Sequence, residues 1–146
     1  MKPAPRLSVI VAVNPRDHEV IDRTITALAD QSASRSDYEV LIVDPEHTRE
    51  RESTMRRISE ANQDLRLRYI RTDKRGRAAS HNRGAEEAST GLLLFLADDF
   101  VPTHVLIEEH LKCHEAHPMS HVAAIGPALF SPHLEMTPLM RSIPAA

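Results

Sequence analysis

Two adjacent carboxylates, Asp98 and Asp99, end an apolar run that starts at Leu92, and their position suits them to bind a cation. Gly91 precedes the run and Pro102 follows it, so we expect a strand that is buried on both faces. Neighbouring carboxylates repel each other unless a cation lies beside them. Mg²⁺ and Mn²⁺ prefer oxygen ligands and often share them with phosphates. The pair therefore indicates a metal–diphosphate site, and the alternatives are a solvated turn or a helix cap at Asp99.

Two further polar residues end predicted strands. Asn14 follows the apolar residues 7–13, and Asp44 ends the strand predicted over residues 38–44. The carboxyl ends of parallel strands converge, and ligands of open α/β sheets bind there, so we expect these groups to lie near the two adjacent carboxylates. A basic turn at residues 74–77 opens a predicted helix, whose free N–H groups suit a phosphate.

The elements that must position these residues alternate along the chain. Helices are predicted over residues 15 to about 31, from the turn at 45–48 to about 62, over 77 to 89 and from 103 to 117. Strands are predicted over residues 7–13, 38–44, 67–70, 122–125 and in the run from residue 92. This order predicts an α/β fold with a mostly parallel, doubly wound sheet and helices on both faces. Asn14 and Pro15 are expected to start the first helix, and Thr103 to cap the last. The side of the third helix that faces the sheet is expected to carry small residues, namely Ala78, Ala79, Ala85 and Ala88.

Length and composition limit the possible classes of protein. The chain has 146 residues, a formal net charge of −3, no tryptophan and a single cysteine, Cys113. We expect one domain over residues 1–127 and a proline-rich apolar tail of unassigned structure over residues 128–146. The acidic balance and the low aromatic content argue against nucleic-acid binding. Without a transmembrane segment or signal peptide in the sequence, a cytoplasmic location is expected.

Several familiar motifs are absent or weak. No G-x-G-x-x-G follows the first strand and no G-x-x-x-x-G-K-S/T occurs, which argues against a dinucleotide-binding Rossmann domain and a P-loop NTPase. His110 and His114 are four residues apart on a predicted helix, with Glu109, Cys113 and His117 close by. That spacing can hold zinc, and a solvated helix face is the alternative.

Four stretches, in this order, resemble the inverting, family-2-type glycosyltransferases of the GT-A fold. Residues 8–14 resemble their first strand, 39–44 their second, 75–84 their diphosphate-side loop and helix, and 92–102 their D-x-D strand. The similarity continues through residues 106–118 and 124–141 and so covers nearly the whole chain. The resemblance implies transfer of a sugar from a metal-bound nucleotide sugar, a UDP- or GDP-sugar, to an unknown acceptor.

The resemblance also implies roles for individual residues. Ala12, Val13 and Asn14 would line the base, and Asp44 would accept a hydrogen bond from it. Asp98 would hold the ribose, and Asp99 would bind the Mg²⁺ or Mn²⁺ ion that bridges the diphosphate. The residues expected near the sugar or the phosphates are Lys74, Gly76, His81 and Asn82.

The chain departs from the family pattern at several positions. Ala97 stands at the first D-x-D position, and the acidic turn after the second strand is here Pro45-Glu46. His81 stands where the family usually has arginine, so phosphate affinity is expected to vary with pH. No general base is identified, and the chain is shorter than the family's catalytic domain.

Because of these departures, two other functions are considered. A truncated, catalytically inactive nucleotide-sugar-binding or interaction module is the alternative function, with a second copy or a partner chain covering an exposed sheet edge. A flavodoxin-like receiver or reductase domain is a third possibility, because it shares the order of the strands and the acids at their ends.

Overall fold

The computed structural model describes residues 4–14, 20–46, 48–130 and 135–142 of the chain. The chain divides into two units, Met1–Lys112 and Cys113–Ala146. The first contains the sheet, and the second contains the end of α4 and the short helix α5 (Pro138–Ser142). The predicted boundary after residue 127 stays a prediction, and the predicted helix start at Pro15 lies outside the described residues. Within the described ranges, no helix has the length and apolar character needed to cross a bilayer.

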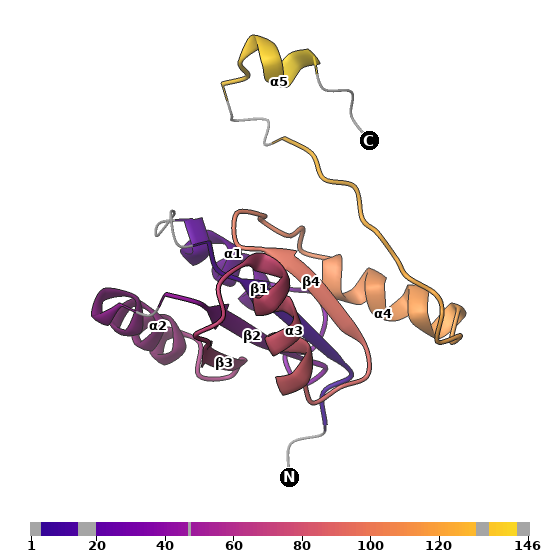
Figure 1. Ribbon diagram of the computed structural model, residues 1–146. Helices are drawn as coiled ribbons and strands as arrows, with labels where there is room; N and C mark the ends of the chain where they lie inside the picture. The colour runs from indigo at the N-terminus through magenta and orange to yellow at the C-terminus, as the bar shows by residue number, and fades with distance from the viewer. Residues whose placement is uncertain (1–3, 15–19, 47, 131–134, 143–146) are drawn as a thin grey trace. The chain divides into compact units, whose positions relative to one another are not determined.

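The first unit is built on a four-stranded sheet in the order β3-β2-β1-β4, shown in Figure 1. All three pairings are parallel, as the alternating order of elements predicted. The strands are β1 (Leu7–Ala12), β2 (Tyr38–Asp44), β3 (Arg66–Arg71) and β4 (Leu93–Ala97). The two central strands, β1 and β2, are buried along their whole length, which explains their rows of β-branched and aliphatic residues.

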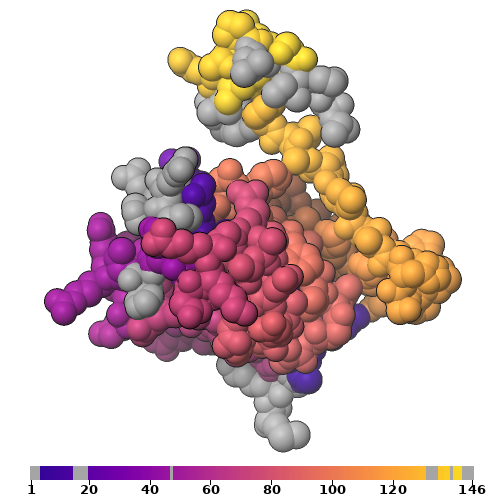
Figure 2. Space-filling view, in the orientation of Figure 1, coloured from indigo at the N-terminus to yellow at the C-terminus, as the bar shows by residue number. Residues whose placement is uncertain are grey.

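Helices cover both faces of this sheet, as predicted. The larger core joins side chains of α1 (Val20–Ala29), α2 (Arg49–Ala61) and the start of α4 (Leu106–Ala116) to one face. Helix α3 (Arg77–Glu87) packs on the other face, against Ile10, Leu41, Val43 and Ile70. In Figure 2, α3 and its neighbouring segments form much of the face of this unit that is turned to the viewer.

The side of α3 that faces the sheet differs from the prediction. Ser80 and Gly84 are its buried residues, whereas Ala78 is exposed and Ala79 half-buried. Ala85 and Ala88, as predicted, pack against the second core. The difference follows from helical periodicity: Gly84 packs closely against Ile10, and Ser80, four residues earlier, lies on the same face of the helix.

Two predictions about strands are wrong. β4 is not buried on both faces, because none of its residues is fully buried and Phe95 is 48% exposed; among the described residues it lies at the edge of the sheet with β1 as its only partner. Residues 122–130 form no strand, and Ile125 is almost fully exposed there. An apolar run identifies a segment that can form a strand, but only a neighbouring strand supplies the hydrogen bonds and the burial.

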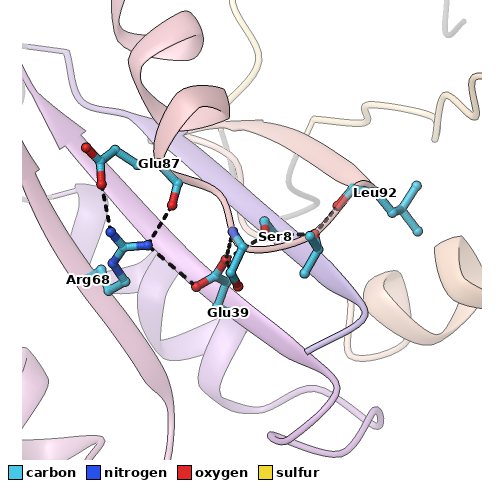
Figure 3. Close-up of polar contacts among 7 residues, drawn as sticks. Ser8, Glu39, Arg68, Glu87 and Leu92 are labelled. Carbon is cyan, nitrogen blue, oxygen red and sulfur yellow. Dashed lines mark hydrogen bonds and ion pairs between the residues drawn. The ribbon is translucent and has the colours of Figure 1, made fainter. Parts of the chain in front are cut away.

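A polar cluster centred on the buried Ser8 and Glu39 closes the amino end of the sheet (Figure 3). The Glu39 carboxylate accepts hydrogen bonds from the hydroxyl of Ser8 at 2.7 Å and from the N–H and hydroxyl of Ser89, both at 2.7 Å. Arg68 donates to the carbonyl and the carboxylate of Glu87 at the end of α3. Burial raises the pKa of Glu39, but these donors together lower it below its ordinary value. The cluster fixes the end of α3 and the approach to β4 against the central strands.

We expect Gly84→Ala to destabilise the fold. A methyl group at this position overlaps Cγ2 of Ile10 and lies 3.2 Å from Cγ2 of Val43. Overpacking costs about 1–3 kcal/mol, of which alanine's higher helix propensity returns up to about 1 kcal/mol. Urea denaturation should therefore show a lower free energy of unfolding. Gly91→Ala is the control, because nothing lies within 4 Å of its added methyl group, and equal stability of the two variants would contradict the packing explanation.

Candidate functional site

The register of the sheet brings the predicted strand-end residues together at its carboxyl edge. Ala12 at the end of β1 pairs with Val43 on one side and with Ala97 on the other. Asp44, the last residue of β2, and Asp98, the residue directly after β4, therefore flank the end of β1. Strand alternation places Asp44 on the face that carries the larger core, since Ile42 belongs to that core, and the Asp98 backbone contacts Thr24 of α1, which covers the same face.

The turn after β4 holds the two adjacent acids in different environments. The N–H of Phe100 donates to the carbonyl of Ala97 at 3.2 Å, so Asp98 and Asp99 form the middle of a tight turn. Asp98 is 3% exposed, and its Oδ2 accepts from the N–H of Asn14 at 2.5 Å. Asp99 is exposed. Burial raises the pKa of Asp98, and the charge of Asp99 adds to this increase, although the Asn14 N–H opposes it.

Asp44 is completely buried and already has three donors. Its Oδ1 accepts from Arg51 at 2.7 Å and from the N–H of Glu46 at 2.9 Å, and its Oδ2 accepts from the hydroxyl of Tyr69 at 2.7 Å. The Thr48 hydroxyl caps α2 by accepting from the N–H of Arg51, which lies in the first turn of the helix, close to the end of β2. A ligand in this region would thus meet the arginine and the tyrosine together with the acid.

Arg51 and Tyr69 were not identified from the sequence. A signal for Arg51 was available: it lies in the first turn of a helix that follows the strand ending in Asp44. This signal is weak, because most arginines at such positions are exposed to solvent. The burial of Tyr69 and its bond to Asp44 raise the tyrosine's pKa far above the ordinary value, so its hydroxyl stays protonated.

A pocket of about 250 Å³ opens beside this buried pair. Val13 and Asp44 line it together with Arg51, Tyr69 and side chains of α1 and α2. Ala12 is also buried at this edge, and Asn14 beyond it is exposed. Three of the residues predicted to contact a base, Val13, Asn14 and Asp44, thus lie at or beside one hollow.

The predicted phosphate-side residues belong to the start of α3 and the loop before it. α3 ends beside the amino-edge cluster, so its first turn lies toward the carboxyl edge. Lys74 and Asn82 are exposed, and Gly76 precedes the helix with a φ of +106°, which favours glycine. The free N–H groups of this first helical turn suit an anion.

His81 has an unusual environment for a residue predicted to contact phosphate. Its ring lies against Phe95 of β4 with the ring centroids 5.1 Å apart. Its Nε2 is buried and has no hydrogen-bond partner within the part of the chain that the structure describes. Burial lowers the pKa of His81 and the neighbouring Arg77 lowers it further, which favours the neutral ring at neutral pH.

The acids at this edge fit one kind of metal site. Over the described ranges, no three His, Cys, Asp or Glu side chains are grouped so that they could hold a metal ion, on α4 or elsewhere. A cage made only of protein ligands therefore does not fit. The exposed carboxylate of Asp99 is a hard oxygen donor, and it fits an ion that takes most of its ligands from phosphates and water.

We expect the Asp44–Arg51 pair to be important for folding. Arg51→Met leaves a buried carboxylate without its cation and should cost about 3–5 kcal/mol, whereas Tyr69→Phe should cost only about 1 kcal/mol. Chemical denaturation of both variants tests this order. Adding Asp44→Asn to Arg51→Met should recover part of the loss, and no recovery would argue against an electrostatic cause.

We expect Asp98→Asn to stabilise the protein at high pH. Burial raises the folded-state pKa of Asp98 above its ordinary value, so ionisation of this residue destabilises the folded state as the pH rises from the unfolded-state pKa through the folded-state pKa. The neutral variant should therefore have a higher melting temperature than the wild type at about pH 8, and this advantage should shrink as the pH falls and Asp98 takes up its proton. A variant that is less stable than the wild type throughout this pH range would contradict the expectation.

The comparison with protein families supports the resemblance found in the sequence. The model of the family described as "Glycosyl transferase family 2" matches residues 8–141. The validoxylamine A glucosyltransferase of Streptomyces hygroscopicus subsp. limoneus is 30% identical over 146 residues, covering 96% of this chain and 31% of that protein. Glycosyltransferase AglE of Haloferax volcanii is 32% identical over 104 residues, covering 71% of this chain and 34% of its own. The chain thus spans about a third of the length of these relatives.

Solved structures show the same fold. S. aureus TarS 1–349 in complex with UDP matches with a TM-score of 0.66 and 20% identity, covering 77% of this chain and 33% of that one. The mannosyltransferase PcManGT from Pyrobaculum calidifontis, in complex with GDP-Man and Mn²⁺, matches with a TM-score of 0.62 and 27% identity, covering 70% and 30%. The sheet order, the strand-end acids and the family match over residues 8–141 lead to one conclusion: the chain belongs to glycosyl transferase family 2 and has the GT-A fold.

Proposed function

We propose that residues 1–127 form the donor-binding part of an inverting glycosyltransferase that uses a UDP- or GDP-sugar together with Mg²⁺ or Mn²⁺. One observation carries the proposal: the register of the sheet brings the acidic turn after β4 and the end of β2 to the two sides of the end of β1. A pocket and the first turn of a helix lie at the same edge, so a base and a diphosphate each have a complementary surface.

The nucleoside occupies the pocket at the ends of β1 and β2. Its base lies against Ala12, Val13 and Asn14, and Asp44 accepts a hydrogen bond from it. Arg51 and Tyr69 hold that carboxylate in place. Asp98 lies on the other side of β1 and is oriented by the Asn14 N–H, as a residue that holds the ribose would be.

The diphosphate lies between the turn after β4 and the start of α3. Asp99 holds the divalent ion, and Lys74, Gly76, His81 and Asn82 lie on the phosphate or sugar side. The ion, when bound, offsets the negative charge that develops on the departing nucleoside diphosphate. The exposed Lys74 supplies a further positive charge, and the N–H groups at the start of α3 supply donors.

The names of the structural neighbours support this choice of ligand. TarS was solved with UDP and PcManGT with GDP-Man and Mn²⁺, and both share the fold of this chain. Those ligands belong to those proteins. Their relevance here rests on the matched sheet together with the acids and the pocket at its carboxyl edge.

A second function fits the open edge of the sheet. The described part of the chain provides no neighbour for the outer side of β4, and no residue is identified as the general base that an inverting transfer needs. A nucleotide-sugar-binding module without transferase activity, completed by a second copy or a partner chain, therefore remains the alternative. Binding of a nucleotide sugar without transfer to any acceptor would favour it.

The binding test uses the chain as it stands. Calorimetric titration with UDP-glucose and GDP-mannose, with Mn²⁺ and with EDTA, should show metal-dependent binding of at least one of them. Asp99→Ala should abolish the contribution of the metal, because it removes the exposed carboxylate that holds the ion. We expect a loss of about tenfold or more in affinity with Mn²⁺, equivalent to about 1.4 kcal/mol, and little change in EDTA.

Asp64→Asn is the matched control for this test. Asp64 is an exposed carboxylate just before β3, at the opposite end of the sheet, so its removal changes the net charge equally. The site assignment fails if the wild type binds no nucleotide sugar, or if Asp99→Ala binds as tightly as Asp64→Asn in Mn²⁺.

A further inference from the structure

Thr24, a buried residue of α1, makes an unexpected contact with the acidic turn after β4. It is 0% exposed, and its hydroxyl lies 2.7 Å from the carbonyl oxygen of Asp98 and 3.0 Å from that of Phe100. A hydroxyl has one hydrogen, so it serves the two carbonyls as a shared donor. The two carbonyls belong to the residues on either side of Asp99.

We infer that Thr24 is a positioning residue that holds the Asp98–Phe100 turn so that the exposed Asp99 carboxylate faces the metal and the diphosphate. The inference rests on the proposed function and deepens it, since it names the group that orients the metal ligand. The Phe100 N–H bond to Ala97 closes the turn and the Asn14 N–H holds the Asp98 carboxylate, and Thr24 adds hydrogen bonds from a packed helix to the backbone on both sides of Asp99.

The same helix and the residues that follow it also hold the other end of this segment. The Gln31 side chain donates to the carbonyl of Thr103 at 2.8 Å and accepts from the N–H of Ile107 at 3.0 Å. The N–H of Ser32 donates to the carbonyl of His104 at 2.8 Å. Gln31 thereby caps α4, and this explains why α4 starts at Leu106 rather than directly after Thr103.

Between these two attachments the chain has no regular structure, and Phe100 and Val101 are exposed. Hydrogen bonds from α1 and the residues after it therefore help to determine the path of residues 98–107, beside the turn's own bond and the bond from Asn14. Thr24 acts at the end that carries the acids, and Gln31 acts at the end that starts α4. Variants of Thr24 and Gln31 can therefore distinguish an effect on the proposed metal ligand from an effect on the stability of α4.

The experiment compares three variants with the wild type. Thr24→Val keeps the shape of the side chain but leaves the two carbonyls without the hydroxyl, Thr24→Ser keeps the hydroxyl, and Gln31→Leu removes the cap of α4. The measurements are UDP affinity with Mn²⁺, UDP affinity in EDTA, melting temperature, and hydrogen exchange at the amides of Phe100 and Asn14 in the free protein.

We expect Thr24→Val to weaken binding of UDP with Mn²⁺ by about tenfold, with the affinity in EDTA changed by less than about twofold. Exchange at the Phe100 amide should become faster, because the turn is freed from α1. Thr24→Ser keeps the hydroxyl, so its UDP affinity with Mn²⁺ and its exchange rate at the Phe100 amide should match those of the wild type. Gln31→Leu should lower the melting temperature but leave the contribution of Mn²⁺ to UDP affinity unchanged.

The outcomes separate this inference from the proposed function. If the wild type binds no UDP, the proposed function fails, and unchanged exchange at Phe100 in Thr24→Val then overturns the positioning role as well. If the wild type binds UDP with Mn²⁺ and Thr24→Val binds it equally well, the positioning role alone is wrong. Thr24→Ala serves in place of Thr24→Val if the valine variant does not fold.

Discussion

The hydrogen bond from the N–H of Asn14 to the carboxylate of Asp98 joins the end of β1 to the turn after β4, and the candidate site depends on it. It directs a carboxylate toward the centre of the sheet edge, where burial alone would favour its neutral form. The parallel register makes the bond possible, because the pairing of Ala12 with Ala97 brings the residues that follow them, Asn14 and Asp98, close together. Together with the bonds from Thr24, it sets the position of the adjacent acids relative to the end of β1.

Two buried acids, Glu39 at the amino end of the sheet and Asp98 at the carboxyl end, have pKa values shifted in opposite directions. At the amino end, Glu39 has enough donors to lower its pKa, so its charge is fully supported within the chain. At the carboxyl end, the pKa of Asp98 is raised and Nε2 of His81 lacks a partner among the described residues. Groups left partly unsatisfied by the protein are those that a cation or a phosphate can satisfy. This contrast supports the proposal that a ligand binds at the carboxyl end of the sheet.

Several elements could be predicted because their cause is local. The apolar rows of β1 and β2 need burial on both faces wherever they are placed, and the acids at strand ends follow from the chain order. The burial of β4 could not be predicted, because a strand's exposure depends on whether a further strand lies beside it, as the 48% exposed Phe95 shows. The inner residues of α3 depend equally on the close approach of Gly84 to Ile10.

The sequence by itself determined the alternation of strands and helices, the parallel sheet and the acids at its carboxyl edge, since hydrophobic spacing and chain order act over short distances. The tertiary structure alone decided which side chains support those acids. Arg51 reaches Asp44 from a helix, and Thr24 reaches the turn after β4 across more than seventy residues of sequence. Such contacts carry no local pattern, because a hydroxyl or guanidinium becomes a partner only when packing removes water and brings the acceptor within reach.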